Sequence, residues 1–115
     1  MAQKKGGIQH FTVQEAHNVN LGQGGSVFLD TDATTFTPTN GVVIAITSLS
    51  GSCSFDTLTA EDPTKYVGVG TDGYEGGGDA LSSSDTIPQG VTIYGRWTSV
   101  SVHQDNDRCI CYIGA

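Results

Sequence analysis

The last third of the chain consists largely of residues that favour β-strands. Residues 87–103 read IPQGVTIYGRWTSVSVH, and residues 108–114 read RCICYIG. β-Branched and aromatic side chains fill both stretches, and Asp105-Asn106-Asp107 separates them where a turn would lie. The two stretches therefore predict a strand-rich scaffold, and neither contains a recognisable catalytic motif.

The composition extends this prediction to the whole chain. The 115 residues include 14 Thr, 10 Val and 7 Ile but only 5 Leu, 3 Glu and 3 Lys, so strand formers outnumber helix formers. This length suits a single hydrophobic core. We expect an all-β fold, a β-sandwich or jelly roll of about seven to eight short antiparallel strands. Residues 1–7 form a flexible N-terminal arm in this prediction, and residues 8–115 form a single β domain.

Alternating or apolar segments between turn residues mark the remaining strands. The expected strands before the last third are residues 8–13, 26–29, 34–37, 42–49, 53–58 and 66–69. Residues 42–49 begin with five apolar side chains, so this strand should be central in the sheet and covered on both faces. The glycine- and serine-rich residues 70–90 are the longest irregular stretch, and such a length is typical of a functional or mobile loop.

The end of the chain predicts a closing hairpin. If residues 104–107 form its loop, Val102 lies opposite Cys109 and Val100 lies opposite Cys111. These four side chains would then share one face, which we expect to be the core face.

The residues upstream of this hairpin change parity. The bulky residues Ile93 and Trp97 have odd numbers, whereas Val100 has an even one. Because side chains alternate along a strand, keeping all three inward requires a bulge or bend near Thr98-Ser99. Burial of both faces is the alternative.

The charge balance argues against nucleic acid as a partner. The chain carries twelve acidic and five basic residues, a formal net charge of −7, and the few cations cannot form a phosphate-binding stripe. Lys4 and Lys5 lie together in the arm, which could dock on an acidic neighbour or could be a frayed, solubilising terminus.

No segment of the sequence predicts a membrane span or a signal peptide. The longest apolar run, residues 42–46, is far too short to cross a bilayer. Cys53, Cys109 and Cys111 are odd in number and lack the spacing of a disulfide scaffold, so we expect free, buried thiols and synthesis in a reducing cytoplasm.

The candidate ligand-binding motifs lack the neighbouring residues that their ligands require. Residues 68–73 match G-x-G-x-x-G, but the glycines that follow cannot open the helix that a dinucleotide requires. Residues 30–41 begin like a calcium loop but lack its glycine and its final glutamate. Asp72, Glu75 and Asp79 could close around a cation, although solvated loop carboxylates are the simpler interpretation.

Cys109 and Cys111 with His103 suggest a zinc site, but the hairpin register directs His103 to the opposite face. Buried cysteines that act as small apolar residues fit better. His10 and His17 have no evident nucleophile partner, and the chain lacks G-x-S-x-G. We therefore predict that the protein is not an enzyme and binds neither a metal nor a cofactor.

Three aromatic residues, Tyr94, Trp97 and Tyr112, could form a platform for a sugar ring. In a strand-rich domain such residues more often belong to the core or to a protein interface.

Three stretches together resemble a known class of protein. They are residues 55–66 (FDTLTAEDPTKY), residues 87–98 (IPQGVTIYGRWT) and residues 111–114 (CYIG). They resemble small virion structural proteins of tailed bacteriophages, particularly of marine phages that infect cyanobacteria. The similarity spans roughly residues 36–115. It departs at residues 103–108 (HQDNDR), where such proteins tend to have a compact glycine-containing turn.

The resemblance implies a capsid decoration (cement) protein that binds the major capsid protein on the outer surface of the virion and is made in the host cytoplasm. It further implies a homo-oligomer, with a trimer favoured. A tail or head fibre module that binds host-surface carbohydrate is the alternative. The residues expected at the partner interface are Lys4, Lys5, Ile8, Phe11, Tyr74, Trp97 and Tyr112.

Overall fold

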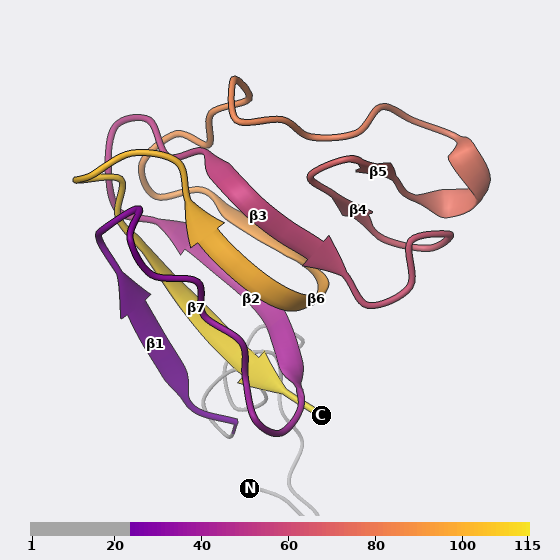
Figure 1. The fold of residues 1–115 in the computed structure, drawn as a ribbon, viewed down its shortest axis with the longest axis horizontal. Helices are drawn as coiled ribbons and strands as arrows, with labels where there is room; N and C mark the ends of the chain where they lie inside the picture. The colour runs from indigo at the N-terminus through magenta and orange to yellow at the C-terminus, as the bar shows by residue number, and fades with distance from the viewer. Residues whose placement is uncertain (1–23) are drawn as a thin grey trace, which may run out of the picture.

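The structure, a computed structural model, describes residues 24–115, which form seven β-strands and one short 3-10 helix (Figure 1). The elements are β1 (Ser26–Leu29), β2 (Val42–Ser48), β3 (Phe55–Ala60), β4 (Val67–Gly68), β5 (Thr71–Asp72), η1 (Tyr74–Gly76), β6 (Thr92–Val102) and β7 (Cys109–Gly114). Five strands form one sheet in the order β1-β7-β2-β6-β3, and β4 and β5 form a small second sheet. Every pairing between these strands is antiparallel.

The all-β prediction is confirmed. A β-sandwich or jelly roll is not confirmed, because the described residues contain one large sheet and one two-stranded ribbon. The predicted arm (residues 1–7) and the predicted strand at residues 8–13 lie outside the described residues, together with Lys4, Lys5, Ile8 and Phe11.

Strand β2 lies at the centre of the large sheet, as its apolar sequence predicts, and five of its seven residues are buried. Val43 faces Ile113 of β7, whereas Ala45 faces the preceding residue, Tyr112. Ile44 is therefore the extra residue of a β-bulge, and Val43 and Ala45 project from opposite faces of the sheet.

The predicted closing hairpin is wrong. Strand β2 lies between β6 and β7, so Val102 pairs with Phe55 and Cys109 pairs with Ser48. The most apolar strand takes the middle position because there it is covered by neighbours along both edges. The predicted face is nevertheless correct, since Val100, Val102, Cys109 and Cys111 are all fully buried.

The predicted bulge is present at Thr98. Thr59 of β3 faces Ser99, whereas the next residue, Ala60, faces Trp97, so Thr98 has no counterpart in β3. This extra residue lets Trp97 and Val100 both enter the core despite their opposite parity.

The core lies against one face of the large sheet and is covered by connecting segments. Phe36, Val69, Leu81 and Ile87 pack on it from loops. The chain is fixed there by backbone pairing, because Ile87 N–H donates to the Cys53 carbonyl at 2.7 Å and Cys53 N–H donates back at 3.2 Å. Residues 70–90, expected as a functional or mobile loop, thus supply part of the cover of the core.

Residues 61–80, which contain β4, β5 and η1, project beyond β3 (Figure 1); we call them the lobe. The lobe is attached where Val69 N–H donates to the Leu58 carbonyl at 2.9 Å. A Cβ at Gly68 would lie 2.2 Å from that carbonyl oxygen, so the close approach of these two backbone segments requires glycine.

Candidate interaction surfaces

The face of the large sheet opposite the core, which we call the outer face, carries an apolar half and a hydroxyl half. The apolar half lies over β1, β7, β2 and the start of β6, and its side chains include Phe28, Ala45, Tyr94, Ile110 and Tyr112. The hydroxyl half lies mainly over β6 and β3 and carries Thr47, Thr57, Thr59, Thr92, Ser99 and the buried Ser101.

Two tyrosines flank an alanine in the apolar half. Ala45 pairs with Tyr94 on one side and with Tyr112 on the other, so the three side chains form one row across the sheet. Tyr94 is 56% exposed and Phe28 is 51% exposed, whereas Ala45 is buried between its neighbours. Large side chains of this kind at the surface are typical of contacts with another protein.

The hydroxyl half satisfies part of its own hydrogen bonding. The hydroxyl oxygens of Thr47 and Thr92 lie 2.7 Å apart, and Ser99 Oγ donates to Thr59 Oγ1 at 2.8 Å. Hydroxyl groups paired in this way can be covered by a partner without leaving unpaired polar atoms.

Charged side chains are sparse on the part of the outer face formed by residues 24–115, although the chain is strongly acidic. Residues 24–115 hold every acidic residue except Glu15, but only three basic ones, a formal charge of −8. The two charged residues within the strands of the large sheet that adjoin this face, Asp56 and Arg96, both lie at irregular positions in the strand register. The acidic groups are therefore concentrated in the loops and the lobe.

Arg96 is held at the root of the lobe. Its Nε donates to Glu61 Oε1 at 2.6 Å, and its Nη1 donates to the Ala115 carbonyl at 2.8 Å. The hydrogen bond from Arg96 lowers the pKa of Glu61 below its ordinary value. This charge is consequently paired within the chain.

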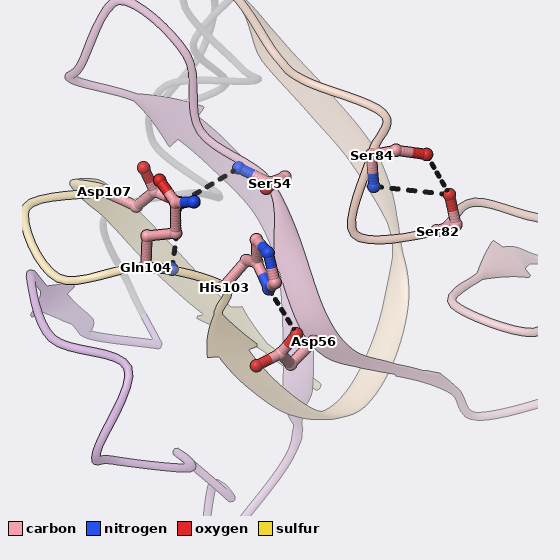
Figure 2. A network of polar contacts seen from close by, with 7 residues as sticks. All are labelled: Ser54, Asp56, Ser82, Ser84, His103, Gln104 and Asp107. Carbon is pink, nitrogen blue, oxygen red and sulfur yellow. Dashed lines mark hydrogen bonds and ion pairs between the residues drawn. The ribbon is translucent and has the colours of Figure 1, made fainter.

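Carboxylates gather where β1 ends and the β6–β7 connection turns. Thr31 Oγ1 donates to Asp105 Oδ1 at 3.0 Å. A side-chain hydrogen bond with Asp105 raises the pKa of Asp32, whereas the Thr31 hydroxyl lowers the pKa of Asp105. Nearby, His103 Nδ1 lies 2.7 Å from Asp56 Oδ1, an arrangement that Figure 2 shows.

Asp107 organises the β6–β7 connection from inside. Its buried carboxylate accepts the backbone N–H of Gln104 at 3.2 Å and that of Ser54 at 3.5 Å (Figure 2). The side chain thus joins the β6–β7 connection to the chain before β3, which is a structural role.

The three cysteines are buried free thiols, as predicted. The sulfurs of Cys109 and Cys111 lie 4.0 Å apart. Hydrogen bonding to Cys109, followed by burial, raises the pKa of the Cys53 thiol well above its ordinary value, and hydrogen bonding to Cys111 raises that of Cys109. Protonated thiols are poor nucleophiles and poor metal ligands. Among residues 24–115, no three His, Cys, Asp or Glu side chains are grouped to hold a metal ion.

The structure separates the residues expected at a partner interface. Trp97 is only 1% exposed, and its Nε1–H donates to the Val67 carbonyl at 2.8 Å, so its assignment to the interface and to a sugar platform is wrong. Tyr112 lies on the outer face, in the same row as Tyr94 and separated from it by Ala45. Tyr74 is 71% exposed on the lobe, next to Glu75, whose φ of 49° is left-handed.

Sequence reasoning missed Phe28 and Ile110, which belong to the apolar half of the outer face. Their strand positions alternate with those of Leu29 and Cys109, and this alternation was the available signal.

Comparisons with protein-family models, curated proteins and solved structures found no match. Within residues 24–115, no helix is long and apolar enough to cross a membrane.

Proposed function

We propose that the protein is a structural component of a bacteriophage virion, a decoration protein that binds the major capsid protein on the outside of the shell. Two lines support this proposal. The three stretches named above resemble virion proteins, and the sheet offers a broad face with exposed aromatic residues and few charges, which suits contact with another protein.

The outer face is the observation that carries the proposal. Protein interfaces exclude charged groups from their centres and favour aromatic side chains, because a buried unpaired charge is costly to desolvate. The row Tyr94–Ala45–Tyr112 and the neighbouring Phe28 have this character, whereas most acidic residues of the described chain lie in the loops and the lobe. We place the capsid against the outer face.

The net negative charge of the described residues fits an external position. A formal charge of −8 over residues 24–115 repels the phosphate backbone of packaged DNA. We therefore propose no nucleic-acid partner and assembly onto the shell from the host cytoplasm.

Binding to empty capsid shells tests the proposal. Full-length protein should co-sediment with shells that lack it, and Tyr94→Glu should weaken this binding at least about tenfold by placing a charge in the contact. Thr86→Glu adds the same charge to the exposed loop over the core and should bind as the unmodified protein does. Unaltered binding by Tyr94→Glu, or no binding by the unmodified protein, would contradict the proposal.

One observation favours the carbohydrate-binding fibre module as a second candidate. Tyr94 and Tyr112 flank Ala45 on one face, and pairs of aromatic rings can stack on sugars. A glycan array with Tyr94→Ala as the control separates the candidates, because a decoration protein gives no glycan signal and a fibre module gives one that Tyr94→Ala abolishes.

A further inference from the structure

The two edges of the large sheet differ in how they are covered. At the β3 edge, Val69 N–H donates to the Leu58 carbonyl, and Gly68 packs against the same backbone. The register of β3 is also interrupted near Asp56, and bulges and charges at an edge oppose pairing with another chain. The lobe therefore blocks this edge.

The β1 edge has none of these features. Among residues 24–115, β1 pairs only with β7, and its sequence Ser26-Val27-Phe28-Leu29 contains no charge, proline or bulge. Unprotected edges of this kind pair readily with another strand.

The hydrogen-bond pattern shows which groups of β1 are available. The Gly25 carbonyl accepts the N–H of Ile113 at 2.9 Å, so Val27 and Leu29, which follow at intervals of two, also direct their backbone groups toward β7. The N–H and C=O groups of Ser26 and Phe28 consequently point away from β7, toward the edge.

We propose that β1 of one copy pairs antiparallel with β1 of a second copy about a two-fold axis. The pairing joins two five-stranded sheets into one of ten strands. It also places the two outer faces side by side, because residues of like parity lie opposite each other.

A second copy fits this edge better than an unlike partner. A two-fold contact joins the same uncharged strand to itself, whereas a head-to-tail contact would have to use the β3 edge, which the lobe blocks. Asp30 and Asp32 follow β1, so antiparallel pairing places the acidic ends of the two copies at opposite ends of the contact. Phe28, half-exposed in one copy, is covered by the second.

This contact is independent of capsid binding and differs from the trimer that the sequence resemblance implies. A three-fold assembly would have to use another surface, such as the lobe.

Hydrogen exchange of the full-length protein tests the proposal residue by residue. As concentration rises, the amides of Ser26 and Phe28 should become protected while the molecular mass doubles. The amides of Val27 and Leu29, bonded to β7, should be protected throughout. A monomeric mass at all concentrations overturns the proposal. So does protection of Ser26 and Phe28 that is independent of concentration, which would show that residues 1–23 cover the edge.

A matched pair of variants identifies the edge. Ser26→Pro removes an outward N–H without touching a β7 hydrogen bond, and it should weaken dimerisation at least about tenfold, since the loss occurs twice per dimer. Ser26→Ala keeps the N–H and should dimerise normally. Phe28→Lys, compared with Phe28→Thr, gives the same test should Ser26→Pro fail to fold. If folded Ser26→Pro dimerises as strongly as Ser26→Ala, or folded Phe28→Lys as strongly as Phe28→Thr, the proposal is overturned.

Discussion

The indole of Trp97 lies in the core, where its N–H donates to the Val67 carbonyl and its ring covers Gly95. A Cβ built on Gly95 would lie 2.6 Å from Trp97 Cζ2. The hydrogen bond to Val67 joins β6 to the lobe. The packing of the ring on Gly95 explains why glycine precedes Arg96-Trp97.

Gly95→Ala should therefore destabilise the fold. The added methyl displaces the indole from a packed site, and overpacking of this kind costs about 1–3 kcal/mol. Gly51→Ala is the control, because a Cβ there meets no atom within 4 Å and should change stability little. Urea unfolding of both variants measures the difference, and equal midpoints would refute the role given to the indole.

Burial of Trp97 also has a spectroscopic consequence. Because Trp97 is the sole tryptophan, fluorescence of the native protein should be blue-shifted and resist acrylamide, and both properties should disappear in urea. Strong quenching of the native fluorescence by acrylamide would show that Trp97 is exposed to solvent.

The thiols should be inert in the folded state. Cys53 and Cys109 are buried with raised pKa values, so a thiol reagent such as DTNB should react with neither at pH 8 until the protein unfolds. Rapid native-state labelling of either would contradict the packing.

At the scale of elements, the ion pair between Arg96 and Glu61 fixes the root of the lobe to β6. Arg96 lowers the pKa of Glu61, so this contribution to stability is present above the unfolded value of 4.5 and is lost as pH falls through the folded pKa. Glu61 is exposed, so the effect on stability is small.

The titration of Glu61 checks this link directly. By NMR, the Glu61 carboxylate should titrate at lower pH in the unmodified protein than in Arg96→Gln. Arg108→Gln removes a distant exposed charge and should leave the midpoint unchanged. Equal midpoints in all three proteins would show that the pair does not form in solution.

Local features of these elements could be predicted from the sequence, but their partners could not. The bulge at Thr98 and the inward faces of Val100 and Cys109 follow from side-chain alternation alone. The insertion of β2 between β6 and β7 depends on pairing between segments that are distant in the sequence. The turn residues Asp105–Asp107 instead favoured direct pairing of β6 with β7. Alternation in β1 indicates that Phe28 and Leu29 face opposite ways, but which of them is exposed depends on the pairing of β1 with β7.

At the scale of the whole molecule, charge and apolar surface are segregated. Among residues 24–115, the loops and the lobe carry every acidic residue except Asp56 of β3, and charged side chains are sparse on the outer face. Contact through a face with few charges depends weakly on ionic strength, whereas contact through Lys4 and Lys5 would be screened by salt.

Capsid binding should therefore change by less than about threefold between 50 and 500 mM salt. A loss of affinity well beyond this range, reproduced at low salt by replacing Lys4 and Lys5 with alanine, would assign binding to these two lysines instead of the outer face.

Cryo-electron microscopy of intact particles that carry the protein tests whether the outer face contacts the capsid shell. Density for the five-stranded sheet should lie on the outside of the shell, with the row Tyr94–Ala45–Tyr112 covered by the major capsid protein. Density located in the tail, or a sheet on the shell whose outer face points into solvent, would contradict the proposal.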